Sequence, residues 1–172
     1  MQSALNRALV LCFLGLLLWA GSTHADFCRN NLPASNPDGV YVDNGNGTVT
    51  DTRTGLIWKQ CAEGLSGGSC GAGSALTFSW FDALSHAESS TFAGHNDWRL
   101  PNVKELSSLI EDCAFSPAIN TNLFPNTPNA AFWSGSPASD AFGPYYVVFF
   151  DGIVETEWFE SEFRVRLVRE VM

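Results

Sequence analysis

The strongest constraint on this fold lies in residues 97–106, where the sequence is Asp-Trp-Arg-Leu-Pro-Asn-Val-Lys-Glu-Leu. Asn102 is suited to cap a helix, and Glu105 three positions later can bond back to the Asn102 backbone, which makes a capping box. The apolar residues that follow at helical spacing are Leu106, Leu109 and Ile110. The sequence therefore predicts a helix from about Val103 to Asp112.

Residues 1–25 have the three parts of a secretory signal. Arg7 supplies a positive charge, Ala8 to Ala20 is apolar, and Thr23-His24-Ala25 is a small-x-Ala cleavage site. The apolar run is shorter than the roughly 20 residues that a membrane-spanning helix needs. We therefore expect a signal peptide over residues 1–25 and a single exported domain over residues 26–172. This domain would be periplasmic, at the cell surface or secreted, with no membrane span after cleavage.

The cysteines that remain after cleavage predict disulfide bonds, because an exported chain meets an oxidising compartment. They are Cys28, Cys61, Cys70 and Cys113, and an even number allows two bonds with three alternative pairings. Cys61 and Cys70 bracket a Gly/Ser-rich segment that closes easily, which favours Cys61–Cys70 and leaves Cys28–Cys113. No pair has the C-x-x-C spacing of a zinc site, so we expect no metal centre.

The charge of the chain argues against polyanionic partners. Removal of residues 1–25 would take away Arg7 and no acid, leaving eight basic and 18 acidic residues and a formal charge of −10, against −9 for the whole chain. A field of this sign repels nucleic acid, anionic lipid and sulfated polysaccharide at long range. We therefore expect no nucleic-acid partner. The sequence leaves the oligomeric state open.

Short apolar patterns predict antiparallel strands at both ends of the mature domain. The strands lie near residues 40–42, 48–50, 56–58, 132–134, 145–150, 153–158 and 163–169, the last with one apolar and one arginine face. Ser79 and Asp82 begin a helix to about Ser89, with Trp80, Phe81, Ala83, Leu84 and Ala87 as its apolar face. The Asp43–Gly47 turn lacks the ligand spacing of an EF-hand loop, so calcium has no support from a motif, and we expect no cofactor.

The segment from Ala114 to Asp140 is the candidate ligand loop. A loop that long in a compact domain is usually functional or firmly held. Its candidate ligand residues are Asn120, Asn122 and Asn126. Nearby aromatic residues that we expect to be exposed are Tyr145, Tyr146, Trp158 and Phe159, whereas Trp58, Trp98 and Trp133 fit core patterns. We expect Arg99 to be structural and to pair with Glu105.

Several ordered segments resemble the Lcl C-terminal domain family, named after a collagen-like bacterial adhesin. They include Trp98-Arg99-Leu100-Pro101 with Glu105, Asn44 to Asp51, Thr54 to Trp58, Phe132-Trp133-Ser134 and Val165 to Arg169. The family is similar to the C-type-lectin-like fold of formylglycine-generating enzymes. The resemblance implies an α+β fold, with two helices packed on a small twisted antiparallel sheet and a long loop region.

The resemblance does not transfer a catalytic or calcium-dependent activity. No cysteine follows Cys113, although formylglycine-generating enzymes need late reactive cysteines, and the Glu-Pro-Asn, Gln-Pro-Asp and Trp-Asn-Asp tripeptides of calcium-dependent lectins are missing from the sequence. The sequence also contains no His-Glu-x-x-His or Gly-x-Ser-x-Gly motif, and its mature histidines are His86 and His95. We therefore expect no catalytic residues.

The predicted function is a non-catalytic, adhesin-like binding module that recognises a glycan or a surface protein. Two alternatives stay open. One is a saccharide hydrolase with a carboxylate pair, such as Glu111 with Asp112 or two of Glu155, Glu157, Glu160 and Glu162. These acids more often form a solvated face. The other is a structural component of the cell envelope.

Overall fold

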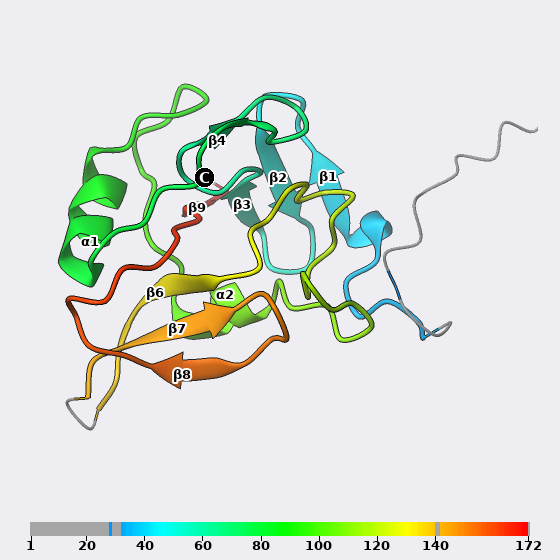
Figure 1. Ribbon diagram of the computed structural model, residues 1–172. Coiled ribbons are helices and arrows are strands. Elements are labelled where there is room, and N and C mark those ends of the chain that lie inside the picture. The colour runs from blue at the N-terminus through cyan, green and yellow to red at the C-terminus, as the bar shows by residue number, and fades with distance from the viewer. Residues whose placement is uncertain (1–27, 29–31, 140–141, 172) are drawn as a thin grey trace, which may run out of the picture.

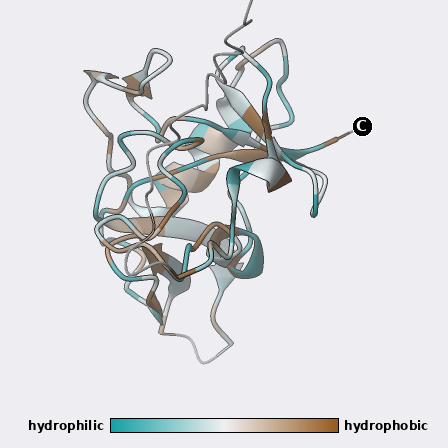
Figure 2. Cartoon of the chain, turned by 90° about the vertical axis from the view of Figure 1, so that its right-hand side faces the viewer, coloured by the Kyte–Doolittle hydropathy of each residue, from teal (hydrophilic) through white to brown (hydrophobic). Residues whose placement is uncertain are grey.

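The computed structural model of this 172-residue chain describes residues 28, 32–139 and 142–171. The predicted signal peptide and Asp140, at the end of the predicted ligand loop, lie outside this part of the chain. Figure 1 shows two larger sheets, with α1 at one side. Hydrophobic and hydrophilic stretches alternate along the chain in Figure 2.

The first sheet joins the beginning of the described chain to its end. Its strand order is β1 (Tyr41–Asp43), β2 (Thr48–Asp51), β3 (Leu56–Lys59) and β9 (Val168–Glu170), and every pair is antiparallel. Val49 lies opposite Trp58, and Trp58 lies opposite Val168. All three side chains are fully buried, so one row of the sheet faces the core.

The second sheet separates two hydrophobic cores. It contains β6 (Ala131–Pro137), β7 (Pro144–Val148) and β8 (Val154–Thr156), again antiparallel. Phe132 and Val147 pack into the core that contains Trp58, whereas their neighbours Trp133 and Tyr146 pack into the core that contains Trp80. Successive strand residues point to opposite faces, so β6 and β7 are buried on both.

The remaining elements are short. β4 (Leu65–Ser66) and β5 (Ala72–Gly73) form a two-stranded ribbon, and η1 (Asp38–Val40) is a 3₁₀ turn before β1. α1 (Trp80–Ser89) begins at the predicted cap, where the Ser79 Oγ accepts a hydrogen bond from the Asp82 N–H. α2 (Val103–Ser107) has the predicted capping box of Asn102 and Glu105.

The predicted fold class is wrong. The described residues form three separate sheets with nine strands, and α1 is the one helix among them longer than five residues. The chain is therefore mostly β. It is not a pair of helices on one small sheet with a C-type-lectin-like arrangement, although α+β describes it loosely.

The second predicted helix ends at Ser107 rather than near Asp112, and serine side chains bond two of its carbonyls. The Ser107 Oγ donates to the Val103 carbonyl and the Ser108 Oγ donates to the Glu105 carbonyl, each at 2.7 Å. After Leu106 the chain turns tightly, and Ile110 then bridges Ile119. The helical spacing of Leu109 and Ile110 therefore reflects burial in a turn.

The C-terminal alternation does not give an arginine face. Val165 and Leu167 are fully buried as expected, but Arg166 is also fully buried and Arg169 is 3% exposed. Residues 163–167 run between the two larger sheets and bond to both sides, because the Lys59 N–H donates to the Leu167 carbonyl and the Trp133 N–H to the Arg164 carbonyl. Residues 165–167 therefore have no solvent side.

The signature residues around α2 are structural. Trp98, Leu100, Pro101 and Trp133 are buried, and Arg99 forms the predicted pair with Glu105, its Nη1 and Nη2 lying 2.7 and 2.9 Å from the two carboxylate oxygens. Burial alone would raise the pKa of Glu105, but the hydrogen bonds from Arg99 and the Asn102 backbone hold it below its usual value.

Glu105→Gln should therefore reduce stability in a pH-dependent way. Because the pKa of Glu105 is lower in the folded chain, its carboxylate stabilises the fold above the ordinary value of 4.5, and this contribution disappears as the pH falls through the folded pKa. We expect a loss of about 1 kcal/mol at pH 6 that shrinks toward pH 3. Urea unfolding at each pH measures it. The control is Glu88→Gln on the exposed side of α1, and a loss that is independent of pH would contradict the prediction.

Candidate functional site

A cleft of about 400 Å³ opens where three segments meet. Its walls are the β1–β2 turn, the end of β3 and the segment from Cys61 to Gly68, and Phe92 lines it from a fourth segment. In Figure 1 the loop that carries β4 lies beside the β1–β2 hairpin. Small-molecule sites have volumes of roughly 300–1,000 Å³. We call this cleft the Lys59 groove.

The β1–β2 turn forms a wall whose shape depends on glycine. Gly47 has a φ of 81°, and a Cβ added there would lie 2.9 Å from the Phe92 Cζ. The Asp43 Oδ1 accepts from the Gly45 N–H at 2.8 Å, and the Asn46 Oδ1 accepts from Thr48. Gly47 therefore lets the Phe92 ring lie directly on the turn.

Two charged side chains, Lys59 and Glu63, line the groove beside that ring. The Lys59 Nζ lies 2.8 Å from the Glu63 Oε1, and the Glu63 Oε2 lies 2.8 Å from the His86 Nε2. The Lys59 and Glu63 side chains are only 11% and 9% exposed. The ammonium group also lies 4.7 Å from the Phe92 ring centroid, a cation–π distance. The charge of Lys59 is therefore paired with Glu63, and Asp43 adds a further acid to the lining of the groove.

A buried arginine, Arg166, bonds to the backbone at the end of β3, where the chain lines the groove. The Arg166 Nη1 donates to the carbonyls of Lys59 and Gln60, and its Nη2 donates to the Thr127 Oγ1 at 2.7 Å. Burial lowers the pKa of Arg166 to about 9, while the charge of Glu63 acts in the opposite direction. The guanidinium therefore remains charged at neutral pH and fixes the end of β3.

Both predicted disulfides are present, and one of them closes the wall of the groove. The bonds are Cys61–Cys70 and Cys28–Cys113. The Asn126 Nδ2 donates to the Ser69 carbonyl at 2.8 Å, so the predicted ligand loop braces the Cys61–Cys70 segment from outside. Among the predicted ligand asparagines, Asn126 is the exposed one.

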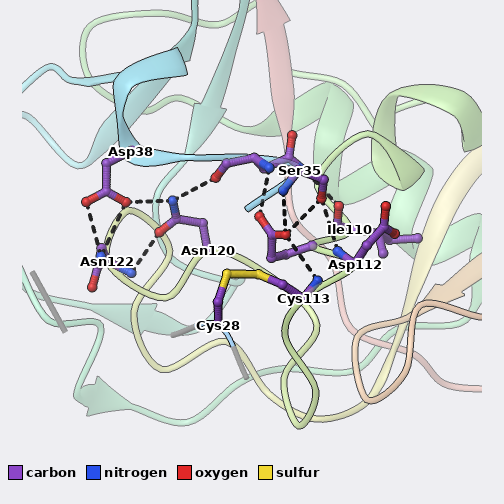
Figure 3. The surroundings of a disulfide bond; sticks show 10 residues. Cys28, Ser35, Asp38, Ile110, Asp112, Cys113, Asn120 and Asn122 are labelled. Carbon is purple, nitrogen blue, oxygen red and sulfur yellow. Dashed lines mark hydrogen bonds between the residues drawn. A yellow bond between two sulfur atoms is a disulfide. The ribbon is translucent and has the colours of Figure 1, made fainter. Parts of the chain in front are cut away.

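The other two predicted asparagines hold the N-terminal lead-in. Asn120 is fully buried, and its Nδ2 donates to the Asn36 carbonyl at 3.0 Å and to the Asp38 Oδ1 at 2.8 Å. The Asn122 Nδ2 reaches the Asp38 Oδ2 at 3.1 Å (Figure 3). The structure thus brings Asn120 and Asn122 together at Asp38, where they fix the backbone.

The predicted aromatic surface divides into two parts. Tyr146 is buried and its hydroxyl donates to the Glu155 Oε2 at 2.8 Å; burial and then Glu155 raise its pKa to about 12. Tyr145 is half-buried. Trp158 is 61% exposed, as expected, and Phe159 is half-buried against α1. The exposure predicted for Tyr146 is wrong, because the cross-strand position beside Trp133 is interior.

One group in the described chain has the composition of a metal site but not the chemistry. Ligand atoms of Cys28, Glu111 and Cys113 lie within 4.8 Å of one another. The two sulfur atoms are bonded to each other (Figure 3), and the Glu111 carboxylate accepts backbone hydrogen bonds. A disulfide supplies no thiolate, so these residues do not fit a metal ion.

Sequence reasoning missed the residues of the Lys59 groove. Lys59 appears isolated in the sequence, and Glu63 and His86 belong to different elements. The one local signal was Gly47, which ends the Asp43–Gly47 turn. The cluster becomes visible only when α1 is placed beside the end of β3.

Comparisons with known proteins identify a family for the chain. In the described residues no helix is long and apolar enough to cross a membrane. No curated protein and no solved structure matches the chain. The model of the Lcl C-terminal domain matches residues 47–169, which run from β2 into β9 and include most of the groove. The chain therefore belongs to the Lcl C-terminal domain family.

Proposed function

We propose that this chain is an exported, non-catalytic binding module and that the Lys59 groove holds a neutral, polar ligand such as a segment of glycan. The observation that carries the proposal is a 400 Å³ cleft lined by the Phe92 ring and by the paired charges of Lys59 and Glu63. The two disulfides fit the oxidising compartment that export implies.

The lining of the groove matches the chemistry of a sugar. The Phe92 ring, 36% exposed, offers an apolar face to the C–H groups of a pyranose. The exposed Asn46 and Asp43 and the glycine-rich Gly64–Gly68 segment offer amide, carboxylate and backbone groups to its hydroxyls. Because Lys59 is already paired with Glu63, the groove has no unpaired cation that would favour an acidic sugar.

The same arrangement argues for binding rather than hydrolysis. Asp43 and Glu63 line one cleft, and a glycosidase needs two such carboxyl groups. However, the two oxygens of Glu63 lie 2.8 Å from Lys59 and His86. A carboxylate held by two bases in this way is poorly placed to deliver a proton to a leaving group.

Phe92→Ala should weaken glycan binding at least about tenfold, because it removes the ring that a sugar would contact. The probe is a printed glycan array, followed by calorimetry with the glycans that bind the labelled wild-type chain. Phe150→Ala is the matched control, since Phe150 is 41% exposed and lies outside the groove. Equal loss in both variants, or no glycan bound by the wild type, would contradict the proposal. Cleavage of a bound glycan that Glu63→Gln abolishes would favour the hydrolase instead.

Heparin should be retained weakly or not at all. The basic residues of the described chain are Arg53, Lys59, Arg99, Lys104, Arg164, Arg166 and Arg169. Arg53, Lys59, Arg99 and Arg169 lie within ion-pair distance of acids and Arg166 is fully buried, so few cations of the described chain are left for a sulfated polysaccharide. A heparin column measures this directly. Retention beyond about 0.3 M salt would show a local cationic site that the overall negative field does not cancel.

A further inference from the structure

We propose that an acidic aromatic surface, made by Phe81, Trp158 and Phe159, binds an arginine- or lysine-rich segment of a partner protein. None of these residues lines the Lys59 groove. The proposal therefore concerns a second site, which does not depend on the ligand of the groove.

The aromatic residues of this surface are held by α1 and by the chain after β8. Phe81 stacks on Phe159, with ring centroids 5.3 Å apart and an interplanar angle of 17°. The Trp80 N–H donates to the Phe159 carbonyl at 3.0 Å, which fixes the start of α1 beside this segment. A Cβ on Gly143 would clash with the Glu157 carbonyl, so the Phe142–Gly143 turn also packs closely against it.

Two of these three aromatic side chains are largely exposed to solvent. Phe81 is 60% and Trp158 is 61% exposed. Phe81 belongs to the face of α1 that the sequence predicts to be buried, yet its neighbour Trp80 takes the interior position. Phe81 stacks on Phe159, and Trp158 precedes Phe159 in the chain. Large exposed apolar side chains on two segments that pack together usually mark an interaction site.

The acids of the segment that carries Trp158 and Phe159 specify the partner. From residue 151 to residue 162 the chain has five acids and no base: Asp151, Glu155, Glu157, Glu160 and Glu162. Asp82 adds a further acid in the first turn of α1. Within the described chain none of these carboxylates lies in an ion pair; Glu155 and Glu162 accept from the hydroxyls of Tyr146 and Thr77. Their negative charge is therefore not compensated locally.

An arginine side chain matches both features. Its guanidinium group can stack on the indole of Trp158 and be attracted by the acids of the same segment, and the aliphatic part of a neighbouring basic side chain can cover Phe81. An anionic lipid surface or a nucleic acid would be repelled by the same acids. The chemistry thus favours a basic protein segment.

Acrylamide quenching can report on this site alone. Among the tryptophans that the structure describes, Trp158 is exposed, whereas Trp58, Trp80, Trp98 and Trp133 are at most 9% exposed. The probe is an eight-residue peptide that alternates arginine and glycine. We expect it to lower the quenching constant about twofold, and Trp158→Phe should remove this protection.

Anisotropy of the labelled peptide gives the affinities. We expect Trp158→Ala to weaken binding at least about fivefold, because a cation–π contact is lost. Phe150→Ala and Phe92→Ala should leave the affinity unchanged. A loss in Phe92→Ala equal to that in Trp158→Ala would place the peptide in the groove and overturn the proposal.

Two pairs of acid-to-amide substitutions, which change the net charge equally, distinguish this surface from general attraction to an acidic protein. Glu160→Gln with Glu162→Gln should weaken peptide binding at least about threefold more than Glu88→Gln with Asp112→Asn, which changes the net charge equally. Equal losses would show general attraction to an acidic protein and overturn the proposal. Sedimentation velocity tests a second copy of the chain as the occupant; a dimer that Trp158→Ala dissociates would also overturn it.

Discussion

Arg166→Ala should lower the free energy of unfolding by about 3–5 kcal/mol, because it empties a fully buried site and breaks three hydrogen bonds. The carbonyls of Lys59 and Gln60 and the Thr127 hydroxyl would lose their guanidinium donor. The space beside the Phe124 ring, now 5.0 Å from the guanidinium, would become a cavity. Urea denaturation followed by fluorescence measures the loss.

Arg166→Met separates the cost of the cavity from the cost of the lost hydrogen bonds. Methionine restores much of the volume and removes the cost of burying a charge, but it leaves the three oxygens without their donor. We expect it to recover about 1–2 kcal/mol of the loss in Arg166→Ala. The exposed Lys104→Ala serves as the control and should change stability by less than about 0.5 kcal/mol. A cost below about 1 kcal/mol for Arg166→Ala would mean that the hydrogen bonds do not hold the end of β3.

Local patterns in the sequence predicted the local structure well. The Asn102 cap, the Ser79 cap and the β1–β2 turn depend on residues a few positions apart, and each is present. The disulfide pairing also followed, because closure of the short Cys61–Cys70 loop leaves one complement. These predictions needed no knowledge of distant neighbours.

Long-range burial explains the failures. The alternation from Phe163 to Arg169 is typical of a strand with one solvent face, but two sheets enclose the segment and Arg166 is buried on the supposed polar side. The sequence likewise could not show that the chain would leave the helix after Ser107 and bridge Ile110 to Ile119. In both cases partners elsewhere in the chain decided the outcome.

Long-range contacts also decided which residues line the candidate site. Asn120 has the residue type of a ligand-binding group, yet its amide is used inside the fold by Asn36 and Asp38. Lys59 and Glu63 showed no motif, although in the structure they line the groove with Phe92. A polar side chain becomes a candidate ligand group only when the fold leaves it facing a cleft, and residue type does not determine that.

Glu111 is the second buried charge on which the fold depends. It is fully buried, and its Oε1 accepts from the Ser35 N–H and Oγ, each at 2.8 Å, and from the Cys113 N–H at 3.2 Å. Its Oε2 accepts from the Asn36 N–H at 2.7 Å. The carboxylate thus holds the lead-in at the Cys28–Cys113 bond (Figure 3).

Glu111→Gln should lower the free energy of unfolding by about 3 kcal/mol, because glutamine turns an NH₂ group toward N–H donors that now bond a carboxylate. Asp112→Asn, an exposed neighbour, is the control and should have little effect. Replacing Cys28 and Cys113 with serine in the same background completes a double-mutant cycle. Since the disulfide and the carboxylate restrain the same segment, the two losses should fall short of additivity by at least about 1 kcal/mol. Full additivity would mean that each holds the lead-in independently.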